Sequence, residues 1–142
     1  MELKTKQKGN LTELQCITAF YSLGYVVSMP YGDNARYDFI ADVCGNLLKI
    51  QCKTCHSKDG DNFTFECRSA RANTQRSSHC LYTPDEIDYF CTFYNGVCYL
   101  IPVSECGHAK TIRLLPAKNN VHIGINKAED YTLENQLKKY TS

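Results

Sequence analysis

Three polar residues beside apolar stretches, Asp38, Gln51 and Lys53, are of the types that bind a metal ion and a phosphate group. A hard divalent cation such as Mg²⁺ prefers oxygen ligands, which a carboxylate, a carboxamide and a backbone carbonyl can supply. A lysine next to such an ion can stabilise the charge that develops on phosphate oxygens. These residue types therefore suit metal-assisted attack on a phosphodiester, provided that the fold brings them to one place.

A hairpin is predicted to bring them together. Two apolar runs, at 37–43 and 47–54, flank Gly45-Asn46, which is a residue pair favoured in tight turns. With these two residues as the turn, Asp38 lies directly opposite Lys53. Because side chains alternate along a strand, the three polar residues then share one face of the hairpin and the apolar residues form the other.

That polar face has a simpler interpretation as well. It also carries Asp42 and Lys49, so it can be an ordinary solvent-exposed surface. In that case Asp38 and Lys53 form a cross-strand ion pair worth about 0.2–1 kcal/mol and no catalytic site.

The same segment contains the pattern C-x-x-C-H, which is typical of haem c attachment, at Cys52 to His56. An offset of three along a strand sends Cys52 and Cys55 to opposite faces, where they cannot hold one haem. No second closely spaced cysteine pair follows, which argues against zinc. The nine cysteines are odd in number and follow no export signal, so we expect reduced thiols, no haem and no zinc.

A helix is predicted before the first strand. Asn10 offers an N-cap, apolar residues recur at helical spacing from Leu11 to Tyr21, and Gly24 provides a stop. Glu13 stands three residues after Asn10, where a capping-box glutamate belongs. Its position therefore fits a cap as well as a catalytic acid.

Further elements are predicted along the rest of the chain. Asn95-Gly96, between apolar runs, predicts a second hairpin, and Phe63 to Cys67 is expected to continue the meander of strands. The polar, arginine-rich stretch 68–79 is expected to be a mobile loop. Thr83 to Glu86 has the form of a helix start. Near the C-terminus we expect a strand at 111–115 and a helix at 133–140.

Length and composition bound the class of protein. The chain has 142 residues, 43% of them hydrophobic, which predicts one compact domain over residues 1–142. No apolar run approaches the length of a membrane span, and the N-terminus is polar, so we expect a cytoplasmic protein without membrane contact. The net charge of +1 leaves nucleic-acid binding open, because such enzymes can be basic only where they meet phosphate.

The motifs resemble the PD-(D/E)XK nuclease core, in a variant that has Gln in place of the second acid. The closest resemblance is to homing endonucleases encoded in bacterial group I introns, and archaeal-type Holliday junction resolvases share the same core. The likeness covers about residues 6 to 102. It rests on K-G-x-x-x-E at Lys8 to Glu13, R-Y-D at Arg36 to Asp38, Q-x-K at Gln51 to Lys53, and I-D-Y-F at Ile87 to Phe90.

The resemblance implies an α/β fold, with a restriction-endonuclease-like mixed β-sheet flanked by helices. It implies a Mg²⁺-dependent endonuclease that cuts duplex DNA and acts as a homo-oligomer, a dimer or a tetramer. It assigns catalytic roles to Glu13, Asp38, Gln51 and Lys53. It assigns metal binding to Glu13, Asp38, Gln51 and the backbone carbonyl of Cys52. Candidate DNA contacts are Lys6, Lys8, Arg36, Arg68, Arg71 and Arg76.

Two positions depart from the family pattern. Tyr37 stands where the proline of the family name would precede Asp38, and Gln51 removes a negative charge from the metal site. A resolvase-like nuclease, a restriction enzyme and a catalytically inactive DNA-binding module of the same fold are therefore kept as alternatives.

Overall fold

A mixed five-stranded sheet forms the centre of the computed structural model, which describes residues 1–72, 77–115 and 126–141. The strand order is β1-β2-β3-β7-β8; β3 and β7 run parallel, and the other neighbours are antiparallel. The strands are β1 (Val26–Ser28), β2 (Phe39–Val43), β3 (Asn46–Cys52), β7 (Tyr89–Tyr94) and β8 (Val97–Pro102).

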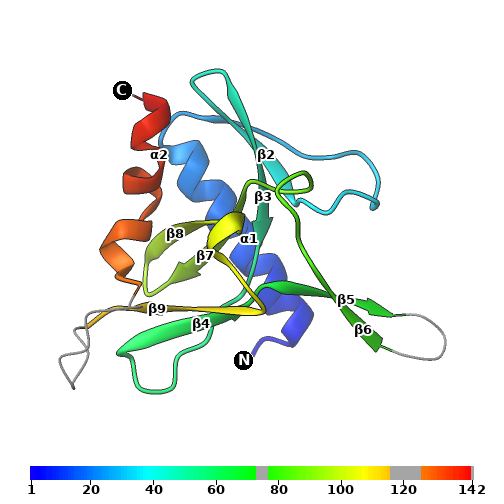
Figure 1. Ribbon diagram of the computed structural model, residues 1–142, viewed down its shortest axis with the longest axis vertical. Coiled ribbons are helices and arrows are strands. Elements are labelled where there is room, and N and C mark those ends of the chain that lie inside the picture. The colour runs from blue at the N-terminus through cyan, green and yellow to red at the C-terminus, as the bar shows by residue number, and fades with distance from the viewer. Residues whose placement is uncertain (73–76, 116–125, 142) are drawn as a thin grey trace.

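Two layers cover this sheet, as Figure 1 shows. On one face, α1 (Thr5–Ser22) and α2 (Leu133–Thr141) pack on a core that includes Phe20, Phe39 and Leu137. On the other face, a second core around Phe63 and Phe90 joins β7 and β8 to smaller elements. These elements are β4 (Asn62–Glu66), η1 (Val103–Glu105), β9 (Ala109–Arg113) and η2 (Ala128–Tyr131). The α/β arrangement is therefore as predicted.

The helix α1 is longer than the sequence pattern indicated. It begins at Thr5, and the N–H of Lys4 donates to Gln7 Oε1 at 2.9 Å, so the predicted start at Asn10 is wrong. No residue between Thr5 and Asn10 breaks a helix outright, so the chain propagates it from the earlier start. Glu13 therefore lies in the middle of the helix and is not a cap. Of the described helices, neither α1 nor α2 is long and apolar enough to cross a membrane.

The hairpin of β2 and β3 forms with a turn one residue earlier than predicted. Cys44 and Gly45, with φ of 54° and 87°, are the central residues, and Val43 pairs with Asn46. A two-residue turn of this type needs φ > 0 at both centres, and glycine meets that need without steric cost. The register is therefore two positions from the predicted one. A shift of two keeps each side chain on its predicted face.

The other hairpin has the predicted turn. Asn95 and Gly96 have φ of 49° and 83°, and Tyr94 pairs with Val97 across them. The helix at the C-terminus and a strand overlapping 111–115 are also confirmed as α2 and β9.

Two predictions for the middle of the chain are wrong. Phe63 to Cys67 does not continue the meander, because β4 pairs with the distant β9. The stretch 68–79 is no loop over its described residues: β5 (Arg68–Ala72) and β6 (Ser77–Leu81) pair as an antiparallel ribbon that projects from the body in Figure 1. The sequences of these strands, RSARA and SSHCL, lack the apolar alternation that marks a packed strand, which is why the pattern suggested a loop. Thr83 to Glu86 forms a hydrogen-bonded turn and not a helix.

Candidate active site

Asp38 is fixed to the neighbouring strand by two hydrogen bonds. Its N–H donates to the Ile50 carbonyl, and its Oδ2 accepts from the N–H of Cys52, both at 2.8 Å. Its other oxygen, Oδ1, has no hydrogen bond from the described residues. Burial raises the pKa of this carboxyl, and the Cys52 N–H and the charge of Lys53 lower it by less. The carboxylate is therefore positioned, half-buried and able to offer an oxygen to a cation.

The amide of Gln51 lies beside this carboxylate. With Nε2 turned inward, Gln51 donates to the Arg36 carbonyl at 2.6 Å and to Asp38 Oδ2 at 3.3 Å. With Oε1 in that position, three oxygens face one another, which is a donor set for a hard cation. Gln51 can thus serve either as a hydrogen-bond donor to Asp38 or as a ligand next to it.

Glu13 reaches the same place from α1. The pKa of its carboxyl is raised by burial first and then by the negative charge of Asp38, which places the two carboxylates within electrostatic range. Two carboxylates that repel each other are relieved by a divalent cation between them. Glu13, Asp38 and Gln51 therefore fit Mg²⁺ by the chemistry of their donors. Cys52 meets Asp38 through its N–H, so a role for its carbonyl stays a prediction.

Lys53 is held at the edge of this group. Its Nζ donates to the Arg68 carbonyl at 2.9 Å and lies 5.2 Å from the centre of the Tyr82 ring. Burial lowers the pKa of Lys53, although nearby negative groups, Asp38 among them, oppose that change. The described residues form ion pairs at Arg36–Glu86 and Arg68–Glu66, and none between Asp38 and Lys53. The simple cross-strand ion pair is therefore not what these two residues make.

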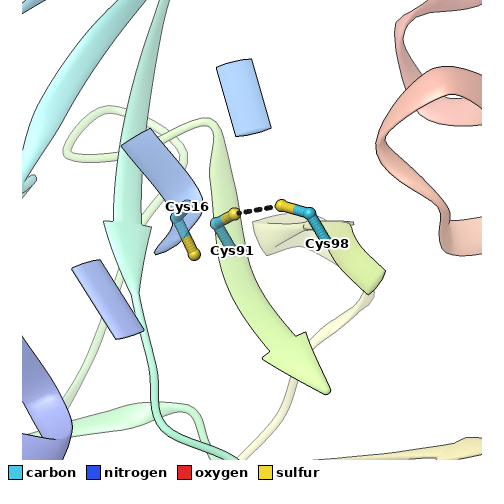
Figure 2. A group of neighbouring side chains, drawn as sticks. All are labelled: Cys16, Cys91 and Cys98. Carbon is cyan, nitrogen blue, oxygen red and sulfur yellow. Dashed lines mark hydrogen bonds between the residues drawn. The ribbon is translucent and has the colours of Figure 1, made fainter. Parts of the chain in front are cut away.

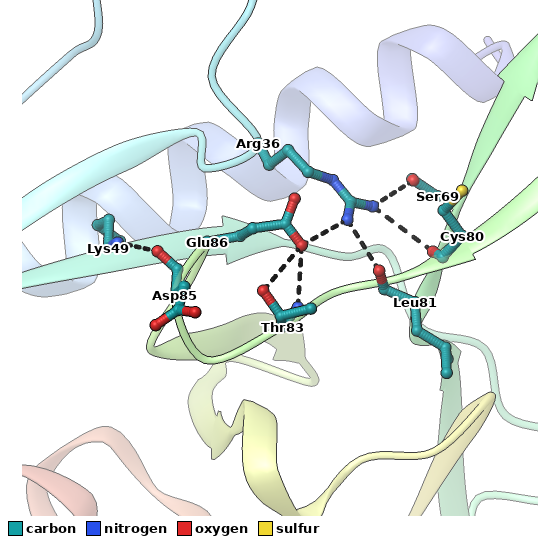
Figure 3. A network of polar contacts seen from close by, with 8 residues as sticks. All are labelled: Arg36, Lys49, Ser69, Cys80, Leu81, Thr83, Asp85 and Glu86. Atoms are coloured by element: carbon teal, nitrogen blue, oxygen red, sulfur yellow. Dashed lines mark hydrogen bonds and ion pairs between the residues drawn. The ribbon is translucent and has the colours of Figure 1, made fainter.

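Arg36 is part of an internal network, drawn in Figure 3. Its Nη1 donates to Glu86 Oε1 and to the Leu81 carbonyl, both at 2.8 Å, and its Nη2 donates to Ser69 Oγ. Glu86 in turn accepts from the N–H and the hydroxyl of Thr83. This network attaches the base of the β5–β6 ribbon to the segment before β2 that carries Asp38. Arg36 therefore has protein partners at the position where the sequence suggested a DNA contact.

Tyr82 is a site residue that the sequence did not single out. The guanidinium of Arg36 lies 3.8 Å from the centre of its ring, Lys53 Nζ lies 5.2 Å from the same centre, and Phe90 packs against it edge-on. Two cations on one aromatic ring are each stabilised by its quadrupole. No local pattern marks Tyr82, because its partners lie far away in the chain.

Among the remaining basic candidates, Lys6, Lys8 and Arg68 form no ion pair with Asp38. Lys6 and Lys8 are exposed near the start of α1. Arg68 pairs through Nε with Glu66 Oε1 at 2.5 Å, and Arg71 lies in β5 opposite Ser78. Arg76 is outside the described residues.

The I-D-Y-F segment has a structural role next to the site. Asp88 Oδ2 accepts from the Lys49 N–H at 2.8 Å, and the Asp88 N–H donates to the Lys49 carbonyl at 2.9 Å. The side chain of Lys49 donates to the Asp85 carbonyl, as Figure 3 also shows. These bonds hold β3 beside β7 and so fix the strand that carries Gln51.

Comparison with known proteins shows the fold and the family of this chain. The solved structure of a bacterial homing endonuclease, I-Ssp6803I, matches with a TM-score of 0.75 and 24% identity, over 95% of this chain and 93% of that one. This match confirms the restriction-endonuclease-like fold. No curated protein matches the sequence. A family model described as PD-(D/E)XK endonuclease matches residues 3–134, and the chain therefore belongs to the PD-(D/E)XK endonuclease family.

Proposed function

We propose that this nuclease is a Mg²⁺-dependent endonuclease that hydrolyses phosphodiester bonds in duplex DNA, as a site-specific homing enzyme. The observation that carries the proposal is the convergence of Glu13 in α1, Asp38 just before β2 and Gln51 in β3, beside the half-buried Lys53. The likeness to a bacterial homing endonuclease supports the homing role.

Each residue has a distinct part in this proposal. Glu13 and Asp38 supply carboxylate oxygens for the ion, and Gln51 supplies its amide oxygen. Bound Mg²⁺ provides Lewis-acid stabilisation of charge on the scissile phosphate. Lys53 donates a hydrogen bond to a phosphate oxygen as negative charge develops there. Tyr82 keeps the Lys53 ammonium near the ion.

The proposed DNA contacts lie outside the metal site. A two-stranded ribbon has the width to enter the major groove, so we assign DNA contact to the β5–β6 ribbon with Arg68, Arg71 and Arg76. Lys6 and Lys8, exposed near the start of α1, are the other proposed phosphate contacts.

We further propose that residues 1–142 act as one domain, because both core clusters share β7 and β8. Cutting both strands of a duplex calls for two sites, so the enzyme is assigned a dimeric or tetrameric state. With DNA as its substrate, it is assigned to the cytoplasm.

The test is a nicking assay on supercoiled plasmid that carries the uninterrupted insertion site of the gene. We expect cleavage with Mg²⁺, and no cleavage with EDTA or with Asp38→Ala. Asp42→Ala is the matched control, because Asp42 lies on the same strand and face but at the turn, where it accepts from the Gly45 N–H; it should cut like wild type. Equal cleavage by Asp38→Ala and wild type would overturn the proposal.

The same assay separates the alternatives. A resolvase-like enzyme would prefer a four-way junction to the linear site. A catalytically inactive binding module is favoured by one observation, the hydrogen bond that Gln51 Nε2 can donate to Asp38. Such a module would bind the plasmid equally with Mg²⁺ or EDTA and yield no product.

A further inference from the structure

Three buried cysteines converge in the core beneath α1. Cys16, Cys91 and Cys98 expose 0%, 0% and 7% of their surface, and their sulfur atoms all lie within 4.8 Å of one another. The sulfurs of Cys91 and Cys98 are 3.3 Å apart. Figure 2 shows the three side chains meeting from α1, β7 and β8. We call these three residues the thiol cluster.

The sheet register explains the convergence. Cys91 pairs with Leu100 and Phe93 pairs with Cys98, so the two cysteines are diagonal neighbours on the face covered by α1. A fourth thiol adjoins them, because Cys52 pairs with Cys91 across β3 and β7. The chain spacing of these residues gave no hint of a site, because they come from four separate elements.

The sulfur spacing suits a thiophilic cation. Zinc–sulfur bonds of about 2.3 Å place the sulfurs of a tetrahedral site about 3.8 Å apart. The cluster spans that value, from 3.3 Å to no more than 4.8 Å, so shifts of a few tenths of an ångström to about 1 Å would form a site. Thiolate ligands favour Zn²⁺ or Cu⁺ over Mg²⁺.

Cysteine binds a metal ion as the thiolate, so each ligand thiol must give up its proton when the ion binds.

We propose that the thiol cluster binds one thiophilic cation, Zn²⁺ or Cu⁺, with Cys52 as a fourth ligand when the geometry is tetrahedral. Each ligand thiol loses its proton to solvent as its bond to the cation forms. The cation enters by way of Cys98, which lines a groove of about 700 Å³ between α1, β8 and α2. This site uses sulfur, whereas the proposed Mg²⁺ site uses oxygen, and the two adjoin at Cys52, whose N–H donates to Asp38.

The test uses the full chain, purified with reductant and freed of metal by a chelator. Samples are equilibrated with one equivalent of Zn²⁺ or, in a second arm, Cu⁺, then desalted. Bound metal is measured by elemental analysis. We expect one ion per chain in one or both arms.

Two variants make the test specific. Cys98→Ala and Cys91→Ser should each lose the stoichiometric ion, whereas Cys106→Ala, in the other core cluster, should keep it. Circular dichroism confirms that each variant is folded, and only folded variants are scored. A wild type that retains no ion in either arm would overturn the proposal, and so would a cluster variant that binds like wild type.

Discussion

The two hairpins of the central sheet have the same kind of turn and opposite surroundings. Both are closed by two residues with φ > 0. In β7 and β8 four consecutive residues are buried, whereas β2 alternates buried with half-buried positions. The β7–β8 hairpin has a core on each face, and β2 and β3 contribute to the α1 side alone. A polar site can form only where the second face is left uncovered, so one hairpin supplies most of the buried core and the other carries the proposed active site.

The largest expected effect is on the buried hairpin. Phe90→Ala should lower the free energy of unfolding by about 3–5 kcal/mol, because it removes a ring that packs against Phe65 and Tyr82. Leu47→Ala, at a position 64% exposed on β3, is the control and should change it by less than about 0.5 kcal/mol. Urea unfolding measures both. Equal losses of unfolding free energy in the two variants would contradict the different contributions to stability assigned to the two hairpins.

The next largest effect is on the rate of plasmid nicking and concerns the β2–β3 hairpin. Lys53→Met should reduce plasmid nicking by about 10²–10³-fold, because a preorganised donor to the phosphate is lost. The free energy of unfolding of the Lys53→Met variant should change little, since burial already disfavours the charge on Lys53. Lys49→Met is the control, because Lys49 donates to Asp85 away from the site. A nicking rate that falls equally in both variants would count against a special role for Lys53.

A smaller effect on the nicking rate is expected at Tyr82, whose ring contacts both Lys53 of the proposed site and Phe90 of the buried hairpin. Tyr82→Leu removes the ring between Arg36 and Lys53, and a cation–π contact is worth about 0.5–2 kcal/mol. Nicking should slow by about 2- to 30-fold. Tyr82→Phe keeps the ring and should restore most of the rate. If the leucine variant cuts like the phenylalanine variant, the ring does not position Lys53.

The smallest effect is on how the free energy of unfolding depends on pH, and the direction of this dependence tests the burial of Asp38. The pKa of Asp38 is raised in the folded state, so the folded protein binds more protons than the unfolded chain above the ordinary value of 3.8. Wild type therefore loses stability as pH rises from that value through the raised pKa. Asp38→Asn lacks this loss, so in EDTA the variant should gain stability relative to wild type over the same range. Urea unfolding at several pH values tests it, and a relative gain by wild type would contradict the burial of this carboxylate.

The sequence could predict that part of the candidate site which depends on the alternation of side chains along a strand. Asp38 and Gln51 share a face because strand side chains alternate, and this outcome survives the two-position error in register. Glu13 was ambiguous because the start of α1 depends on Lys4 and Gln7, which carry a weaker capping signal than Asn10.

The rest depends on contacts between segments that are distant in the chain. Tyr82 and the thiol cluster are assembled by packing, which leaves no periodic trace in the sequence. The β5–β6 ribbon escaped prediction for another reason: its strands pair with each other, and their sequences, RSARA and SSHCL, show no apolar alternation.

The hydrogen bond from Lys53 to Arg68 has a consequence for how such an enzyme can change its target. The acceptor is a backbone carbonyl, so every amino acid at position 68 supplies it. That position begins the β5–β6 ribbon, to which we assign DNA contact. Side chains along the ribbon can therefore be exchanged, and recognition can drift toward new sequences, while the lysine keeps its anchor. Specificity and reactivity are free to evolve at different speeds within a single chain.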